Sequence, residues 1–375
     1  MNVGLNLIYL VPGETGGMET YARELIPALL DQRPDLRLTA FVNREAAETR
    51  EGPWHDLIPA LTVPVRARRR SEWVRGEQQL LPKLAARNGI DLLHSLASTA
   101  PGWGAFRRVV TIHDVIYRIY PEAHFGLRSS AMRLLVPLAA RRSHRVIVPS
   151  RTTRDDLVRL LGLRPEKIDV VPEGVRTGSA TPLSEAEVRE RHALDERPLV
   201  LALSAKRPHK NLPRLLDALA LIPRGRRPAL VLPGYSTPHE AELRHQIAAL
   251  DLLPDVRLAG WVAPDELEGL YRTAACFVFP SLYEGFGLPV LEAMARGVPV
   301  LCSNRSSLPE VAGQAARFFD PESPQSIADA IESVLGDERE AERLRVAGLE
   351  RARRFSWTAT ARETVACYER TLASA

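Results

Sequence analysis

The chain contains the stretch Glu284-Gly285-Phe286-Gly287-Leu288-Pro289-Val290-Leu291-Glu292, which directly follows the apolar run 276–280. The apolar run is typical of a buried parallel strand, and a proline near the start of segment 289–296 is typical of a first helical turn. A glycine loop between a strand and a helix presents free backbone N–H groups and the positive end of the helix dipole. We therefore expect a phosphate-binding loop here.

Two carboxylates flank this loop, with seven residues between them. Glu284 follows the predicted strand, and Glu292 lies about one turn into the predicted helix. Beside a phosphate site, carboxylates can accept hydrogen bonds from sugar hydroxyls, as an acidic residue does with ribose in dinucleotide-binding folds. The alternative interpretation is a solvated loop glutamate and an ordinary helix-face glutamate. The whole phrase, taken together, favours the sugar-binding interpretation.

The length and composition indicate a globular protein with more than one domain. The chain has 375 residues, of which 45% are hydrophobic and 26% are charged, and this is enough for two cores. Its first residues lack the pattern of a signal peptide, and no run of eighteen apolar residues appears, so we expect a cytoplasmic protein without a spanning helix. Cys276, Cys302 and Cys367 are an odd number, which favours reduced, buried thiols over disulfides or a metal site.

The net charge of +4 is unevenly distributed. Residues 1–175 carry 25 Lys and Arg against 19 Asp and Glu, whereas residues 176–375 carry 25 against 27. A basic amino-terminal half suits anionic lipid headgroups or a phosphorylated acceptor, although a solvated arginine-rich surface explains it equally well. No basic stripe with interleaved aromatic residues appears, so we expect no nucleic-acid partner.

Short apolar runs alternate with helical patterns along most of the chain, which predicts parallel sheets covered on both faces. The runs are 3–10, 38–42, 91–94, 109–112, 146–149 and 168–171, and then 199–203, 230–232, 256–258, 277–279, 298–302 and 317–319. The polar segment 173–197 interrupts the alternation. We therefore expect the fold class α/β, with doubly wound domains of residues 1–175 and 176–355 and substrates bound in a cleft between them.

Two basic segments in the first domain leave alternatives open. Residues 66–70 form an arginine-rich stretch between Trp54 and Trp73, which indicates a solvated loop, a site for an anionic acceptor or a membrane face. The amphipathic helix predicted over 130–142 ends in basic residues. A core-packing helix is the default interpretation, and a peripheral membrane contact is the second. Ser150 is expected to cap the following helix.

The Glu-x7-Glu phrase resembles the donor-binding motif of the retaining GT-B glycosyltransferases of family four. The resemblance extends over nearly the whole chain and implies two Rossmann-like domains, with the last helix, 356–375, returning to the first domain. It implies that Glu284 and the loop amides contact the donor sugar and that Glu292 holds the nucleotide ribose. The donor-binding residues that it implies in this loop are Gly285, Phe286, Gly287, Leu288 and Glu292.

The same resemblance assigns roles in the amino-terminal half. A glycine-rich loop after the first strand contains Gly16 and Gly17, which the resemblance places near the donor phosphates. An apolar strand then delivers His113 and Asp114 at its carboxyl end, where α/β sites lie. A histidine here often lies beside the donor sugar in the family, so we expect His113 to hydrogen-bond the transferred sugar or its leaving side. Asp114 is expected to orient a loop or to serve the acceptor.

The basic residues after the first strand of the second domain fit the family only in part. Lys210 matches the family's lysine, but Ser204 and Ala205 stand where an arginine is usual. The resemblance leaves open whether Lys206 or Arg207 replaces that arginine. Cations here would neutralise charge on a nucleoside diphosphate leaving group. Gly234 ends the next strand, and the backbone at Val262 is implied to contact the nucleobase.

The resemblance implies a metal-independent hexosyltransferase of polysaccharide biosynthesis, with His113, Lys210 and Glu284 as its catalytic residues. The substrates would be a nucleotide sugar, with GDP-mannose favoured, and a glycan or lipid-linked glycan acceptor. UDP-sugars and a deoxythymidine-linked rhamnose remain alternatives. No cofactor is implied, and a peripheral contact with the inner face of the membrane is compatible. The rival functions are a nucleotide-sugar epimerase of the same architecture and a non-catalytic nucleotide-sugar binding protein.

Overall fold

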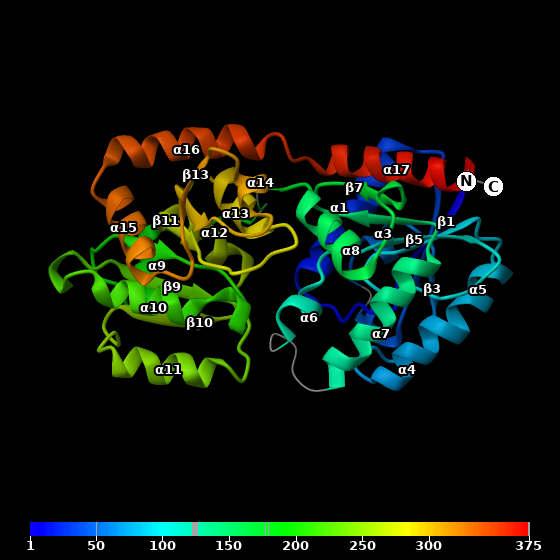
Figure 1. Cartoon of the computed structure of the whole chain (residues 1–375), viewed down its shortest axis with the longest axis horizontal. Helices are drawn as coiled ribbons and strands as arrows, with labels where there is room; N and C mark the ends of the chain where they lie inside the picture. The colour runs from blue at the N-terminus through cyan, green and yellow to red at the C-terminus, as the bar shows by residue number, and fades with distance from the viewer. Residues whose placement is uncertain (50, 122–126, 177, 179, 374–375) are drawn as a thin grey trace. The chain divides into compact units, whose positions relative to one another are not determined.

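Two parallel sheets organise the chain, each within its own compact unit (Figure 1). In this computed structural model, the first unit comprises Met1–Gly174 with Phe355–Ala375, and the second comprises Val175–Arg354. The structure describes residues 1–49, 51–121, 127–176, 178 and 180–373. The strand pairings of both sheets are parallel, which confirms the predicted α/β class with two doubly wound domains.

The first unit has a seven-stranded sheet in the order β3-β2-β1-β4-β5-β6-β7. The strands are β1 (Asn2–Leu7), β2 (Arg37–Val42), β3 (Ala60–Thr62), β4 (Leu92–Ser95), β5 (Arg107–Thr111), β6 (Arg145–Val148) and β7 (Ile168–Val170). The helices are α1 (Gly17–Gln32), α2 (Arg44–Thr49), α3 (Pro53–Asp56), α4 (Arg70–Arg75), α5 (Leu81–Arg87), α6 (Ile116–Ile119), α7 (Leu127–Arg142), α8 (Arg151–Leu161) and α17 (Trp357–Ala373). The strand order reverses between β1 and β4, so the topological switch point of this sheet lies there.

The second unit has a six-stranded sheet in the order β10-β9-β8-β11-β12-β13. The strands are β8 (Leu199–Leu201), β9 (Ala229–Pro233), β10 (Val256–Gly260), β11 (Ala274–Phe279), β12 (Val300–Ser303) and β13 (Ala316–Phe319). The helices are α9 (Glu185–Arg191), α10 (Leu212–Leu221), α11 (Glu240–Ala249), α12 (Pro264–Thr273), α13 (Leu288–Ala295), α14 (Leu308–Ala312), α15 (Pro324–Leu335) and α16 (Glu338–Ala352). This is the 3-2-1-4-5-6 order of dinucleotide-binding folds, with its switch point between β8 and β11.

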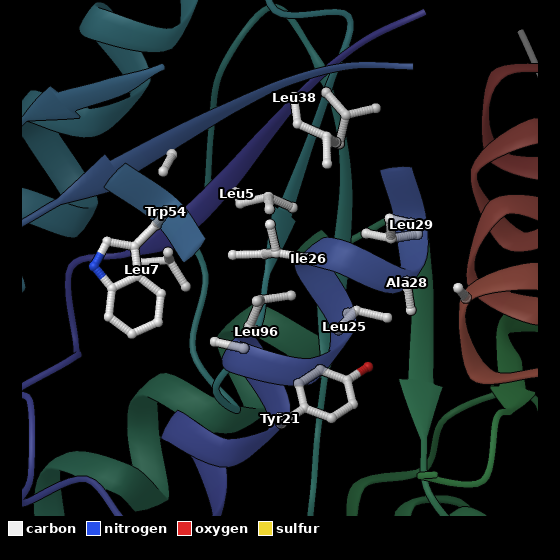
Figure 2. Packing of buried hydrophobic residues seen from close by; sticks show 14 of the residues in the cluster. Leu5, Leu7, Tyr21, Leu25, Ile26, Ala28, Leu29, Leu38, Trp54 and Leu96 are labelled. Atoms are coloured by element: carbon white, nitrogen blue, oxygen red, sulfur yellow. The ribbon is translucent and has the colours of Figure 1, made fainter. Parts of the chain in front are cut away.

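Helix α1 covers one face of the first sheet because its apolar residues repeat every four positions. Tyr21, Leu25 and Leu29 are buried on that face. Their side chains belong to the same buried cluster as Leu5 and Leu7 of β1, part of which Figure 2 draws. Burying each such side chain contributes about 1.5–3 kcal/mol, so this layer holds the carboxyl end of β1 in place.

The last helix, α17, packs within the first unit. Trp357 and Tyr368 are buried in the same cluster as α1, and Arg33 after α1 pairs with Glu369 at 2.6 Å. Where the chain leaves the unit, Gly174 lies so close to this helix that a Cβ would stand 2.3 Å from the Trp357 backbone nitrogen. The segment that leaves the first unit at Gly174 and the helix that returns to it at Trp357 are therefore in close backbone contact.

A local hydrogen bond explains one difference from the expected elements. Strand β1 ends at Leu7 rather than continuing to Leu10, because the Leu10 N–H donates back to the Leu7 carbonyl and forms a turn. The short strand β3, which precedes the arginine-rich stretch, is an edge strand that pairs only with β2 among the described strands. Ser150 caps α8 as predicted, because its Oγ accepts from the Thr153 N–H.

The arginine-rich stretch 66–70 is largely paired with glutamates. Arg66 pairs with Glu48 at 2.9 Å, and Arg68 pairs with Glu14. Arg69 pairs with Glu72 of α4 at 2.9 Å. These partners neutralise much of the local positive charge, so a membrane or acceptor contact here stays a prediction. Within the described ranges, no helix has both the length and the apolar character needed to cross a bilayer.

The three cysteines are free and buried, as predicted. Cys276 lies on β11 and Cys302 on β12 of the second unit, whereas Cys367 lies on α17 of the first. Burial raises the pKa of the Cys276 thiol to about 12, and it raises the pKa of Cys302 as well. Thiolates are the reactive form of cysteine, so these side chains act as small apolar groups in the fold.

Candidate functional site

The switch point of the second sheet gathers most of the residues predicted to bind a donor. Strands β8 and β11 are parallel neighbours, with Leu201 opposite Phe277. The chain after β8 leads to Lys210, and the chain after β11 leads to the glycine loop. Because the carboxyl ends of both strands lie at one edge of the sheet, these two segments meet there.

Lys210 and Glu284 form an ion pair at this edge. The Lys210 Nζ donates to the Glu284 Oε1 at 2.6 Å, and both side chains are largely enclosed, with relative exposures of 17% and 13%. The ammonium also lies 5.2 Å from the centroid of the Phe279 ring, which adds a cation–π contact. An ammonium has three N–H donors, and Glu284 takes one of them. The pair thus places a cation and a carboxylate side by side beside the glycine loop.

The glycine loop leads directly into α13, and Gly287 is the residue that caps the helix. Gly287 has φ of 108° and caps the helix, and a Cβ there would stand 2.6 Å from the Leu308 Cδ2. Two serines hold the loop. The Ser307 Oγ donates to the Phe286 carbonyl at 2.7 Å, and the Glu284 N–H donates to the Ser306 Oγ at 2.9 Å. The loop is therefore fixed before any ligand arrives, with the first turn of α13 next to Glu284.

Glu292 lies on α13, one turn beyond the loop. The Tyr271 hydroxyl donates to its Oε2 at 3.4 Å, and Tyr271 is fully buried. Arg296, one further turn along, donates to the Glu292 carbonyl at 2.9 Å and pairs with Glu268. Burial raises the pKa of Tyr271, and the Glu292 carboxylate raises it further, so Tyr271 stays a neutral donor that orients Glu292.

Lys206 is turned into the protein rather than toward solvent. Its side chain is fully buried, and its Nζ donates to the carbonyls of Leu232 at 2.8 Å and Gly234 at 2.6 Å. Its backbone N–H donates to the Tyr235 carbonyl, and its own carbonyl accepts from the Thr237 hydroxyl. Lys206 thus braces the segment after β9, and its contact with a donor phosphate stays a prediction. Arg207, which is half-buried, is not enclosed in this way.

Replacing Lys206 with methionine is expected to change how stability depends on pH. Burial lowers the pKa of Lys206 from 10.5 to about 8, although the Glu240 carboxylate offsets part of the effect. Between these two values the unfolded chain binds more protons than the folded one, so this lysine makes folding more favourable as pH rises. We expect the free energy of unfolding of the native protein to rise from pH 7.5 to 9.5 relative to Lys206→Met. Denaturant titrations of both proteins at the two pH values measure this, and a constant difference would contradict it.

Gly234 and the segment around Val262 lie at the ends of β9 and β10. Gly234 has φ of 127°, and its N–H donates to the Gly260 carbonyl at 2.5 Å. A Cβ at Gly234 would stand 2.1 Å from the Ser204 carbonyl oxygen. Val262 follows this region directly, and Trp261 beside it is exposed. The backbones that follow β8, β9 and β10 are therefore in close contact at Gly234, and the contact of Val262 with a nucleobase stays a prediction.

In the first unit, Gly16 and Gly17 stand at the start of α1. Gly16 has φ of 65° and caps the helix, and a Cβ at either glycine would meet nothing within 4 Å. The preceding loop is closed by Glu19, whose carboxylate accepts from the Gly13 N–H at 2.8 Å. Thr15 closes it too, since its Oγ1 accepts from the Val11 N–H. The helix start is thus open above the two glycines, and their contact with a donor stays a prediction.

His113 follows β5 and has a partner at both ring nitrogens. Its Nδ1 lies 2.9 Å from the Glu173 Oε1, and its Nε2 lies 2.8 Å from the Leu96 carbonyl oxygen. The neighbouring Asp114 accepts from the Ile116 N–H at 2.9 Å, so it orients the turn into α6. This is the first of the two roles expected for Asp114. The predicted contact of His113 with the sugar is not tested by these bonds.

The structure brings together Lys210, Glu284 and the loop up to Gly287 in the second unit. In the first unit it places His113 just after β5 and the Gly16–Gly17 pair at the start of α1. The sequence alone did not reveal the supporting residues Glu173, Ser306, Ser307 and Tyr271. Ser306 and Ser307 do follow the predicted strand 298–302, so their place at a strand end was a usable signal. Glu173 likewise follows the predicted strand 168–171, but nothing in the sequence linked it to His113, 60 residues earlier.

Two family models match the chain, one for each half. The model described as "Glycosyltransferase Family 4" matches residues 15–179, and the model described as "Glycosyl transferases group 1" matches residues 184–351. The O-antigen chain mannosyltransferase B of Escherichia coli is 34% identical over 269 residues, which are 70% of this chain and 70% of that protein. This chain is a family-four glycosyltransferase.

A longer relative is also similar to this glycosyltransferase over part of its length. The serotype-specific mannosyltransferase WbdA of Escherichia coli is 29% identical over 280 residues, which are 72% of this chain but only 34% of WbdA. The glycosyltransferase therefore corresponds to about a third of that protein.

Solved structures confirm the GT-B fold of the glycosyltransferase. Sucrose-phosphate synthase from Thermosynechococcus elongatus has a TM-score of 0.81 at 21% identity, with both chains covered completely. Anabaena Alr3699/HepE in complex with UDP-glucose has a TM-score of 0.76 at 21% identity, and the match covers 98% of this chain and all of that one. At these identities the likeness establishes the fold and no more.

Proposed function

We propose that this glycosyltransferase moves a hexose from a nucleoside diphosphate sugar to a hydroxyl of a glycan or lipid-linked glycan, with retention of anomeric configuration. Mannose from GDP-mannose is the favoured donor, and polysaccharide biosynthesis is the favoured pathway. The names of the relatives support this choice, since the most similar one described above is an O-antigen chain mannosyltransferase. The UDP-glucose complex of a structural neighbour keeps uridine donors open as the alternative.

The observation that carries the proposal is the Lys210–Glu284 pair beside the capped start of α13. A diphosphate on the first turn of α13 would be held by backbone N–H groups and the helix dipole. Lys210 would neutralise the charge that grows on the leaving diphosphate. Glu284 would accept a hydrogen bond from a sugar hydroxyl, and Glu292 would do the same for the ribose. The Lys210–Glu284 bond and the bond from the Tyr271 hydroxyl to Glu292 support these roles, because they hold the side chains beside the start of α13.

The proposed reaction needs no carboxylate nucleophile. Glu284 is held by Lys210, so its carboxylate is engaged as an acceptor rather than aimed as a nucleophile. The acceptor oxygen would form its bond to the anomeric carbon on the face from which the phosphate oxygen leaves. The acceptor proton would pass to that phosphate oxygen, so charge and protons balance within the two substrates. Catalysis then rests on positioning and on stabilising the leaving group, and we propose that it requires no metal ion.

A screen of nucleotide sugars tests the proposed function. A ligand that binds the folded state raises the melting temperature, so we expect GDP-mannose to raise it more than UDP-glucose or a deoxythymidine-linked rhamnose. The donor that stabilises the protein should then be consumed with a glycan acceptor, in EDTA as well as in magnesium.

Three outcomes would overturn parts of this proposal. Loss of transfer in EDTA would reject the metal-independent reaction. Release of an epimerised free sugar without an acceptor would favour an epimerase. Stabilisation by a nucleotide sugar with neither transfer nor hydrolysis, across all donors and a set of acceptors, would favour a binding protein.

A further inference from the structure

The geometry around His113 points to a specific protonation state. A carbonyl oxygen can only accept a hydrogen bond, so the contact of Nε2 with the Leu96 carbonyl requires a proton on Nε2. The contact of Nδ1 with Glu173 then has two forms. Either a protonated Nδ1 donates to the carboxylate, or a protonated carboxyl donates to a bare Nδ1. The two forms differ only in where one proton lies.

The proton belongs on the histidine. An isolated glutamic acid is more acidic than an imidazolium by about two pKa units, so an unperturbed pair is ionic. Burial of His113 by itself lowers its pKa, but the hydrogen bond and the negative charge of Glu173 outweigh that effect, and the pKa is raised above 6.5. The bond to the Leu96 carbonyl acts in the same direction.

The other charged or titratable neighbours of His113 fit this state. Asp114, on the same segment, adds negative charge that favours the imidazolium. His94 on β4 is fully buried, and burial lowers its pKa to about 3, with the charge of His113 contributing. Tyr21 of α1 contacts the His113 ring edge-on at 4.9 Å, and burial keeps its phenol neutral by raising its pKa. His113 is therefore the one cation in this group.

Glu173 is also well placed to hold His113 rigidly. The two side chains are 9% and 14% exposed, so water competes little for the pair. Glu173 directly precedes Gly174, the residue packed against the Trp357 backbone. The Thr360 hydroxyl also donates to the Pro172 carbonyl at 2.8 Å. The last helix thus contacts the backbone on both sides of Glu173, at Pro172 and at Gly174.

We propose that Glu173 is a positioning residue that keeps His113 as an imidazolium, so that His113 supplies a fixed positive charge to transfer and exchanges no proton. This inference rests on the proposed function for the role of His113 in transfer, but the protonation state itself does not. A fixed cation at the end of β5 would act on negative charge that develops in the substrates during transfer. Glu173 would touch no substrate.

The direct test is nitrogen NMR of the histidine side chains in the full-length protein, labelled with ¹⁵N-histidine. His113→Gln assigns the signal among the nine histidines. We expect both His113 nitrogens to carry protons at pH 7.5 in the native protein. In Glu173→Gln an amide replaces the carboxylate, so we expect a neutral His113 at the same pH. A neutral His113 in the native protein would overturn the proposal.

The second test is the pH profile of donor transfer by Glu173→Gln, Glu173→Asp and the native protein. Without the carboxylate, burial lowers the pKa of His113, and a histidine with a pKa of 6.5 or less is at most about 3% protonated at pH 8. We therefore expect Glu173→Gln to be at least about thirty-fold slower at pH 8 than at pH 5.5 after scaling to the native profile. Glu173→Asp keeps the charge and should follow the native profile. The matched control is Glu166→Gln, which removes an exposed carboxylate elsewhere in the first unit.

These outcomes separate the inference from the proposed function. A uniform loss of rate at every pH in Glu173→Gln would indicate structural damage and overturn the positioning role. A profile identical to that of the native protein would overturn it too. If the native protein transfers no sugar from any donor but the NMR shows the imidazolium, the proposed function fails while the protonation state stands.

Discussion

Replacing Lys210 with methionine is expected to lower kcat for sugar transfer about 10²- to 10³-fold, the usual cost of losing one stabilising group for transition-state charge. Methionine keeps the length and the apolar stem but removes the ammonium that lies 2.6 Å from Glu284. We expect donor KM to change less than kcat, because the charge on the leaving diphosphate is greatest in the transition state. Initial rates over a range of donor concentrations measure both constants.

Two further variants show whether loss of the Lys210 charge causes the expected fall in kcat. Arg214→Met removes an exposed cation four residues away on α10, and its rate should match that of the native protein. The double variant Lys210→Met/Glu284→Gln removes the carboxylate that the single change leaves unpaired, so its melting temperature should recover. Its activity should not. A Lys210→Met rate within a few-fold of the native value would exclude Lys210 from the reaction.

Replacing Gly234 with alanine is expected to destabilise the second unit by at least about 3 kcal/mol, because the residue has a glycine-only conformation and a backbone neighbour. Its φ is 127°, and the added Cβ would stand 2.1 Å from the Ser204 carbonyl oxygen. The Ser204 backbone cannot move aside easily, because its N–H donates to the Pro233 carbonyl. For a domain of this size, we expect the corresponding calorimetric transition to fall by roughly 6–12 °C.

Gly225→Ala is the matched control for this change. Gly225 lies in the same unit, and a Cβ there would meet nothing within 4 Å. The control should leave the transition within about 2 °C of the native one, since an exposed substitution away from strained backbone usually costs under 0.5 kcal/mol. Equal melting temperatures for Gly234→Ala and Gly225→Ala would show that the strand ends relax around a side chain.

The sequence predicted the parts of this protein that depend on local pattern. Short apolar runs mark most strands, because strands buried on both faces have no polar side to show. The Glu284–Glu292 phrase marks the glycine loop between β11 and α13, because a glycine at a helix start and the preceding strand are neighbours in the chain. Lys210 was found in the same way, since it follows the first strand of its domain.

Contacts between distant segments could not be predicted in this way. The chain carries no local sign that Glu173 meets His113, since the folding of the whole sheet brings them together. Lys206 and Arg207 are adjacent basic residues, and the sequence does not distinguish which of them replaces the family's arginine. Only packing shows that the Lys206 ammonium is enclosed by the carbonyls of Leu232 and Gly234. Burial of a charge is a property of the fold and not of the residue.

Each unit contains at least one buried cysteine, whose reaction with a thiol reagent measures how often that unit opens locally or unfolds. A thiol-reactive reagent can modify Cys276 and Cys302 only when the second sheet separates locally or globally, and Cys367 only when α17 lifts from the first. Labelling rates under native conditions would therefore read the opening equilibrium of each half separately. Mass spectrometry of the modified peptides would show which half of the enzyme loosens first, and which half a bound substrate protects.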